Sequence, residues 1–400
     1  MIMQKKILEI LLKTCFIISL TFFAFITGYI VKKYSLFPSS IIEPNLTILK
    51  LKGFKNPFTK VNNGKKFNFK LNEIDKLDYK LILSIDDPEK KQESYFFKTK
   101  TKKITKVISK KHKVILWEKN KLLIKTNKNS FEMIDINGNS IWKKNYPKLI
   151  YQHHWGDINN KNIFLLFKKF VPKPNSILGV EKCTNNNQIR SDVVAIIDKE
   201  SGDLIKELDL LNILKNYPQI YNKIKDVKYC NDPLHTNDVR FIDDINSKYY
   251  GKLILSARWD NLIFILNLEN NKVEYYLKNM TLQQHSPRVL NDQLYIFDNM
   301  ILNDDYKYGL SRVTQIDMNT NKIVGTFSGN EKYFFSATAG GRININQNKL
   351  FILDNNKGEL VMLDCKISRI NESCPVKKVY TTRIKEDDSV IPILIADVFE

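Results

Sequence analysis

The 400-residue sequence is poor in glycine, proline, cysteine and histidine, with 14 Gly, 12 Pro, 5 Cys and 5 His. So little glycine and proline excludes a collagen-like chain and a Pro/Gly-rich low-complexity chain. The cysteines form no C-x-x-C pair, which excludes the common zinc and redox motifs. There is no Walker-type or G-x-G-x-x-G loop to hold a nucleotide. A hydrophobic content of 43% nevertheless suffices for a large folded core.

Acidic residues are also scarce relative to basic ones, and the net charge is +20. Most of this charge is lysine spread along the whole chain, which is typical of a solvated exterior. A nucleic-acid surface would need a basic stripe with interleaved aromatics on one face, so we predict no nucleic-acid partner. The densest run of basic residues, Lys98 to Lys113, could instead contact anionic lipid at a membrane surface. His112, within that run, is expected at the surface.

One long segment lacks charge altogether: "TCFIISLTFFAFITGYIV", residues 14–31. As a helix it would span about 27 Å, close to the thickness of a bilayer's hydrocarbon core. Lys5, Lys6 and Lys13 precede it and favour a cytoplasmic N-terminus. No small-x-small cleavage site follows, so residues 1–33 are predicted to be an uncleaved signal anchor, with a cleaved signal peptide as the alternative. The protein is expected to be a single-pass inner-membrane protein with its remainder on the periplasmic side.

Four cysteines lie outside this segment, and an even number fits two disulfides in an oxidising compartment. Cys365 and Cys374 are close in sequence and are predicted to pair, which leaves Cys183 to pair with Cys230. The alternative is four free buried thiols.

Residues 34–110 are interpreted as a linker and an N-terminal β region. From about residue 67 the chain consists of short apolar runs separated by Asn, Asp, Gly and Lys turns, which indicates an all-β protein. "FEMIDINGNSIW" predicts a hairpin around Asn137-Gly138. After the anchor, the only helix-like stretch is around Asp203 to Tyr217.

Four segments repeat one layout: a polar motif, a strand, a turn, a strand ending in a hydrophobic–Asp or hydrophobic–Asn pair, and another strand. They begin at Tyr151, Leu234, Leu282 and Phe334. The last three begin about fifty residues apart, and such a period is typical of propeller blades. Phe131 to Trp142 ends an earlier blade, and "PILIADVF" is expected to close a sixth. We therefore predict an all-β, six-bladed β-propeller over residues 111–400, preceded by a transmembrane helix.

Four of the five histidines fall at these blade entrances: His153, His154, His235 and His285. A lone histidine is usually structural. In a propeller, however, the innermost strands of all blades start beside the central channel, so side chains at their entrances converge. Three entrances that each supply histidine therefore indicate a functional site.

Asn237, Arg258 and Arg312 accompany the histidines. Arg258 is expected to bind an anion, because a guanidinium matches oxyanion geometry. For Arg312 the alternative is a structural salt bridge to an acid such as Asp260 or Asp298.

Three imidazoles would suit a metal ion, but a guanidinium beside a divalent cation is repulsive. Transfer of an oxyanionic group through a histidine nucleophile fits the set better, because Arg, His and Asn donors spread the charge of the transferring oxygens. The sequence thus predicts no metal and no cofactor.

In the same order along the chain, roughly from Lys113 to Asp364, stand "HH" before a strand, "LHTNDV", "LILSARWDN", "QQHSPRVL", "LYIFDN" and "SRVTQID". This series resembles the bacterial arylsulfotransferases of the periplasmic, nucleotide-independent kind. The resemblance implies a six-bladed propeller that moves a sulfuryl group from an aryl sulfate donor to a phenolic acceptor through a sulfohistidine, without PAPS.

By that resemblance, His285 corresponds to the histidine that becomes sulfated. His235 and Asn237 correspond to the H-x-N pair that holds sulfate oxygens and assists proton transfer, and Arg258 to the sulfate-binding arginine. His154 is favoured over His153 as the remaining histidine.

The sequence departs from the family pattern after the histidine pair, where members commonly have an acid and this chain has Trp155 and Gly156. Two alternatives to the transferase stay open. One is a non-catalytic, membrane-anchored propeller that binds a ligand or protein partner, and the other is a hydrolase that uses water as the acceptor. Neither the resemblance nor the composition predicts an oligomeric state.

Overall fold

The computed structural model describes residues 114–118, 120–135, 137–183, 188–224, 230–299, 311–329, 341–354 and 359–377, together with the backbones of the remaining strands named below. The chain divides into two units, Met1–Thr59 and Lys60–Glu400, and all of these residues belong to the second. No helix within them is long and apolar enough to cross a bilayer. The expected anchor at residues 14–31 and His112 lie outside the described residues.

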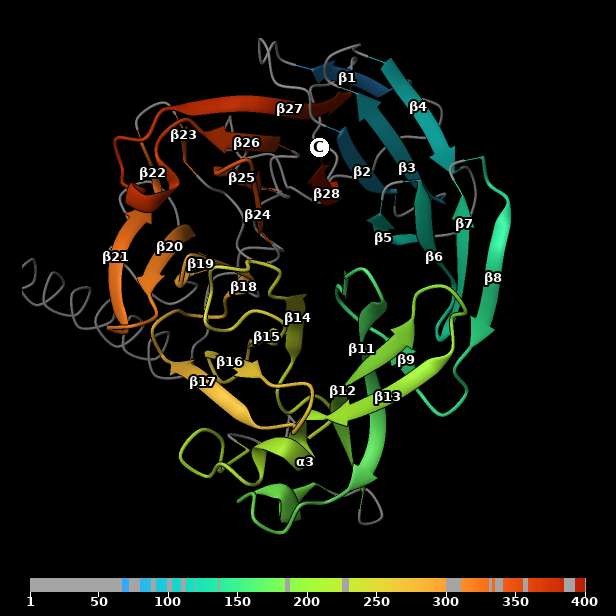
Figure 1. The fold of residues 1–400 in the computed structure, drawn as a ribbon, viewed down its shortest axis with the longest axis vertical. Coiled ribbons are helices and arrows are strands. Elements are labelled where there is room, and N and C mark those ends of the chain that lie inside the picture. Colours follow the sequence, from blue (N-terminus) through green and yellow to red (C-terminus); the bar gives the residue numbers. More distant parts are fainter. Residues whose placement is uncertain are drawn as a thin grey trace, which may run out of the picture. The chain divides into compact units, whose positions relative to one another are not determined.

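The unit that begins at Lys60 is an all-β propeller, as predicted (Figure 1). Along residues 113–384, five antiparallel sheets of four or five strands follow one another in chain order. The first sheet comprises β5 (Lys113–Glu118), β6 (Lys121–Asn127), β7 (Ser130–Asp135) and β8 (Ser140–Asn145). The second comprises β9 (Tyr151–Gln152), β10 (Asp157–Ile158), β11 (Asn162–Pro172), β12 (Gln188–Asp198) and β13 (Leu204–Asp209). The predicted hairpin around Asn137-Gly138 is the β7–β8 connection.

The next three sheets contain the other predicted repeats. They comprise β14 (Thr236–Phe241), β15 (Leu253–Ala257), β16 (Leu262–Leu266) and β17 (Val273–Lys278); β18 (His285–Leu290), β19 (Gln293–Asp298), β20 (Arg312–Asp317) and β21 (Lys322–Phe327); and β24 (Arg342–Asn346), β25 (Lys349–Asp354), β26 (Glu359–Leu363) and β27 (Val376–Ile384). A two-stranded ribbon, β22 (Gly329–Asn330) with β23 (Tyr333–Phe334), stands between the last two sheets in sequence.

Strands from the N-terminal region share sheets with the C-terminal end of the chain. β1 (Phe67–Leu71) pairs with β27, and β28 (Ile393–Phe399) pairs with β2 (Lys80–Asp87), which continues into β3 (Lys91–Lys98) and β4 (Lys103–Ile108). The compact unit Lys60–Glu400 therefore includes strands from the region that we interpreted as a linker and an N-terminal β region. Short-range sequence patterns carry no information about this pairing between distant segments.

The helix expected around Asp203 to Tyr217 is mostly a different structure. Its first part is strand β13, which pairs with β12 at the outer edge of its sheet. Only α3 (Leu210–Leu214) is helical, and it begins where the Asp209 side chain accepts a hydrogen bond from the Asn212 backbone N–H at 3.3 Å.

Asparagine supplies the turn conformations that the glycine-poor chain needs. Left-handed backbone is accessible to Asn more readily than to other side-chain-bearing residues. Positive φ angles occur at Asn261, Asn271, Asn279, Asn291, Asn321 and Asn348. These residues lie in or beside the connections between strands of the third to fifth sheets.

Among the five sheets of residues 113–384, each pair of neighbours packs through its own apolar cluster. Between β11–β12 and β14–β16 the cluster contains Phe164, Val194 and Phe264, all fully buried. Equivalent clusters lie between β5–β7 and β11–β12, between β15–β17 and β19–β20, and between β19–β20 and β24–β26. Because of this packing, β11, β14, β18 and β24 contact one another in succession, and the beginnings of several sheets are brought together.

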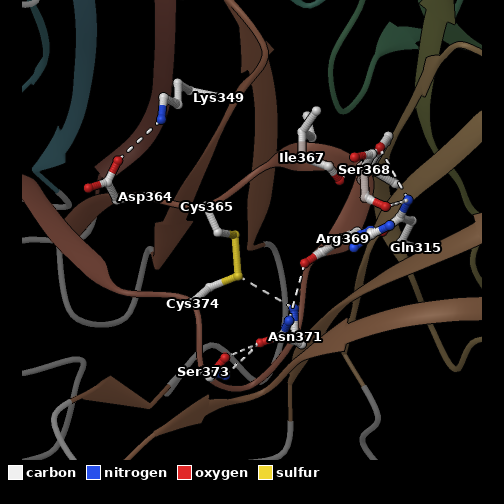
Figure 2. Close-up of a disulfide and its surroundings, with 11 residues drawn as sticks. Gln315, Lys349, Asp364, Cys365, Ile367, Ser368, Arg369, Asn371, Ser373 and Cys374 are labelled. Carbon is white, nitrogen blue, oxygen red and sulfur yellow. Dashed lines mark hydrogen bonds and ion pairs between the residues drawn. A yellow bond between two sulfur atoms is a disulfide. The ribbon is translucent and has the colours of Figure 1, made fainter.

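The two predicted disulfides are confirmed. Cys183 is bonded to Cys230 and Cys365 to Cys374, each with a Cα–Cα distance of 5.4 Å. Figure 2 shows the second, where the backbone N–H of Asn371 lies 3.4 Å from Cys374 Sγ. The first links the segment after β11 to the segment that leads into β14.

The two disulfides should differ in their contribution to stability. Cys183–Cys230 spans 47 residues and Cys365–Cys374 spans 9. Constraining the unfolded chain over these loops is worth about 4 and about 3 kcal/mol respectively. Urea unfolding of the full chain should therefore show a larger loss for the Cys183→Ala/Cys230→Ala pair than for Cys365→Ala/Cys374→Ala. The opposite order would show that native-state contacts, and not loop length, dominate.

Candidate active site

The backbone is strained where the histidine motifs meet. His154 and His235 have φ angles of 52° and 47°, and Ser286, directly after His285, has 56°. Left-handed backbone at residues of these types is uncommon and gathers at functional sites. In addition, β14 and β18 each contain a β-bulge within their first four residues, and such bulges re-aim side chains at strand ends.

His154 and His235 are in direct contact although they are 81 residues apart. Their Nε2 atoms lie 3.1 Å apart, so one ring carries the shared proton and the other accepts it. Burial, together with the nearby His153, His235 and His285, lowers the pKa of His154 well below its usual value. His154 is therefore neutral at physiological pH.

His235 is held from two further sides. Its Nδ1 is hydrogen-bonded to the carboxylate of Asp232, three residues earlier. Its ring centroid lies 4.7 Å from that of Trp259. The backbone N–H of Arg258 donates to the His235 carbonyl at 3.2 Å, which joins the end of β15 to the start of β14. An imidazole bonded to a carboxylate at Nδ1 presents Nε2 for proton transfer.

His153 contacts a buried ion cluster, which we define as Lys168, Asp192 and Asp232. His153 Nε2 lies 2.9 Å from Asp192 Oδ1. Lys168, on β11, forms ion pairs with both aspartates. Burial disfavours the charged form of Lys168, but the two carboxylates overcome it and raise the pKa of this lysine.

His285 is buried at the start of β18. Asn299, which directly follows β19, places its Nδ2 2.6 Å from His285 Nδ1. Burial, aided by the positive charges of Arg258 and Arg342, lowers the pKa of His285 to about 3, and a hydrogen bond from the ring to the Gln283 backbone carbonyl opposes this shift. The ring is neutral at physiological pH and so has a lone pair available for attack.

Arg258 is held by Gln283, whose Oε1 accepts from Nη2 at 2.8 Å, and the guanidinium lies over the ring of Trp259. Its Nε is buried and has no hydrogen-bond partner among the described residues. A buried donor without a partner of this kind suits an oxyanion.

Asn237 donates to the Gln284 carbonyl at 2.7 Å, and its Oδ1 has no partner in the described part of the chain. Asn237 therefore supports the segment that leads into His285.

Arg342, at the start of β24, is a second arginine at the site that sequence reasoning missed. It is buried, it lowers the pKa of His285, and its guanidinium lies 4.0 Å from the ring centroid of Trp155. Trp155, which directly follows the histidine pair, provides an aromatic face beside this cation. Its neighbour Gly156 is needed because a Cβ there would lie 2.2 Å from the carbonyl oxygen of Phe164.

The family model described as "Arylsulfotransferase (ASST)" matches residues 113–372 of the chain. This match covers more than half of the sequence and includes every residue of the site described above. The chain belongs to the arylsulfotransferase family. No curated protein matches this arylsulfotransferase-family chain in a sequence comparison.

Comparison with solved structures finds similarity at low sequence identity. A protein of unknown function from Bacteroides caccae is 10% identical, with 79% of this chain and 97% of that chain covered and a TM-score of 0.46. Apo AztD from Citrobacter koseri is 11% identical, with 80% and 98% covered and a TM-score of 0.41. The Pan2 WD40 domain of Neurospora crassa is 10% identical, with 71% and 73% covered and a TM-score of 0.39.

Arg312, also predicted as a possible site residue, forms an ion pair at the end of β19. Its Nε donates to Asp298 Oδ2 at 3.1 Å, which is the alternative considered above. Asp298 also accepts from the Leu282 backbone N–H at 2.8 Å, so the pair supports the segment before His285.

Sequence reasoning missed Asn299, Arg342, Asp232 and Lys168. The first two had a signal, because "LYIFDN" ends in Asn299 and Arg342 stands at a repeat entrance. Within the residues that the structure describes, no three His, Cys, Asp or Glu side chains gather as a metal site would require.

The contact between Asn299 and His285 predicts a charge-dependent titration. In Asn299→Asp the new carboxylate would stabilise the imidazolium, so the pKa of His285 should rise from about 3. In Asn299→Leu, which removes the amide without adding charge, it should stay low. Histidine NMR titrations of the full chain measure both. An unchanged His285 titration in the Asp variant would mean that Asn299 does not contact the ring.

Proposed function

We propose that this family member is an aryl sulfate sulfotransferase that works through a sulfohistidine on His285 and needs no PAPS or other cofactor. The observation that supports this most is a neutral, buried imidazole beside two guanidiniums and a histidine pair. The donor is an aryl sulfate and the acceptor a phenol. Sulfate oxygens would be bound by Arg258, whose Nε has no partner in the described region, and by His154 and Asn237.

Attack on sulfur requires a free lone pair on one nitrogen of His285. The Asn299 amide contacts Nδ1, so Nε2 is the nitrogen left to accept the sulfuryl group. The ring proton must then sit on Nδ1. The Gln283 carbonyl, which hydrogen-bonds to the ring, is one acceptor for it, and a half-turn of the Asn299 amide would supply its otherwise unpartnered Oδ1 as another.

The transfer has two balanced halves. In the first, a bond forms between sulfur and His285 Nε2, the bond between sulfur and the aryl oxygen breaks, and that oxygen takes a proton from His235. In the second, the acceptor phenol returns a proton to His235, its oxygen bonds to sulfur, and the sulfur–nitrogen bond breaks. Arginine and histidine donors stabilise the sulfuryl oxygens in both transition states.

Replacing the proposed nucleophile should abolish the reaction. The purified full chain, incubated with 4-nitrophenyl sulfate and phenol, should release nitrophenol and acquire one sulfuryl mass increment on the His285 peptide. His285→Asn should show neither, while its melting temperature shows that it folds. Full activity in that variant would contradict the proposal, as would a wild-type chain that never releases nitrophenol.

Arg258 should matter through its shape as well as its charge. Removing one preorganised oxyanion donor typically lowers kcat by about 10²–10³-fold, and we expect such a loss for Arg258→Met. Arg258→Lys keeps the charge but loses the planar fork, so it should recover only part of the rate. Steady-state kinetics with the chromogenic donor test this. Equal rates in all three proteins would favour the alternative, a non-catalytic propeller that binds a ligand or partner.

A hydrolase that uses the same pocket is distinguished by its acceptor. If donor phenol is released at the same rate with and without added phenol, and no sulfated product forms, water is the acceptor.

We also propose that β28-β2-β3-β4 is the sixth blade. β28 contacts β24 and β25 on one side, and β3 contacts β5 on the other, so this sheet adjoins both the fifth and the first (Figure 1). Pairing of the last strand with N-terminal strands would close the ring, so that the outward faces of the first and fifth sheets are covered by a neighbouring sheet.

The proposed location is the periplasmic side of the inner membrane, with residues 1–33 as the anchor. Two disulfides support an oxidising compartment, and the uncharged run at residues 14–31 supports the anchor.

A further inference from the structure

The ion cluster of Lys168, Asp192 and Asp232 has a geometry that a purely structural salt bridge does not require. Lys168 and Asp192 are directly opposite each other in the β11–β12 pairing, and their side chains are 2% and 0% exposed. Asp232 comes from the segment before β14, in the next sheet. One ammonium therefore joins carboxylates from two sheets.

Each carboxylate also contacts a histidine of the site. Asp192 Oδ1 lies 2.9 Å from His153 Nε2, and Asp232 is bonded to His235 Nδ1. The second oxygen of Asp192 accepts the backbone N–H of Thr236 at 2.9 Å, directly after His235. Lys168 thus controls the positions of both carboxylates that orient the imidazoles and the backbone beside one of them.

The cluster holds two carboxylates and one ammonium. Burial opposes ionisation of both aspartates, yet Lys168 and the adjacent histidines lower the pKa of Asp192 and of Asp232. Two carboxylates against one ammonium sum to a single negative charge while the imidazoles are neutral. His235, whose Nε2 contacts that of His154, is the ring bonded to the more exposed of the two carboxylates.

We propose that Lys168 is a positioning residue for proton transfer: by tying Asp232 to Asp192 it orients His235 to protonate the departing aryl oxygen and to accept the proton of the incoming phenol. The inference rests on the proposed sulfotransferase function and adds to it a residue that never touches the substrate. Lys168 acts through Asp232 and His235.

The test uses donors whose phenols differ in acidity. A nitrophenolate leaves without help, whereas a phenol as weakly acidic as a tyrosine side chain, with a pKa of about 10, needs a proton as the bond to sulfur breaks. A positioned general acid typically contributes about 10²–10⁴-fold. Lys168→Met should therefore slow first-turnover sulfuryl transfer from phenyl sulfate by on the order of 10²-fold more than transfer from 4-nitrophenyl sulfate.

The chain provides matched controls in the same strand. Lys169→Met removes a neighbouring lysine that pairs with Glu207 and is 31% exposed, and it should leave the ratio of the two rates unchanged. Asp232→Asn keeps the Lys168–Asp192 pair and removes the contact to His235, so it should reproduce the effect of Lys168→Met. It decides the test if Lys168→Met fails to fold.

The outcomes separate this inference from the proposed function. If wild-type protein transfers from both donors but the rate ratio is unchanged in Lys168→Met and Asp232→Asn, Lys168 is structural and the inference is overturned. If wild-type protein transfers from neither donor, the sulfotransferase proposal itself fails. A selective loss with phenyl sulfate supports both.

Discussion

Packing of neighbouring blades, apolar face against apolar face, is the constraint on which the rest of the structure depends. The middle strands β15 and β16 are buried at every position because each has a blade on either side, whereas β17 at the edge alternates between buried and exposed residues. Burial on both faces holds each sheet against the next, so the starts of β14 and β18 and the segment before β11 lie together. A site assembled from several blades needs this rigidity, since each blade contributes only one or two side chains.

Desolvation then sets the chemistry of the assembled site. Charged groups survive burial only when they are paired, and Lys168 with its two carboxylates meets that requirement. His285 is in the opposite position, because its buried ring faces guanidiniums and not carboxylates, and it stays neutral. A single polar region therefore holds two histidines joined through their Nε2 atoms and a neutral His285, whose surroundings differ.

Several site residues could be predicted because their residue types are rare in this chain. Histidine is rare in this chain, so its recurrence at three repeat entrances stood out, and the same repeat located Arg258. Lys168 could not be found in this way, since in a lysine-rich sequence "FKKF" resembles any solvated strand end. Only the pairing with β12 shows that the first lysine is buried and the second is not. Arg312 illustrates the converse, because an arginine in a family motif turned out to hold Asp298.

The all-β architecture and the blade repeat could be predicted from the sequence alone, because they follow from local hydrophobic alternation and turn residues. The cysteine pairs could also be predicted, because four cysteines lie outside the apolar segment and two of them are close in sequence. The sequence also singled out the histidines that meet. Tertiary structure alone decided which partner each polar group has. It pairs β1 with β27 and β28 with β2 across more than 300 residues, and it brings Asp232 to Lys168 and Asn299 to His285. Such contacts depend on how buried surfaces fit between blades, and no short stretch of sequence contains that information.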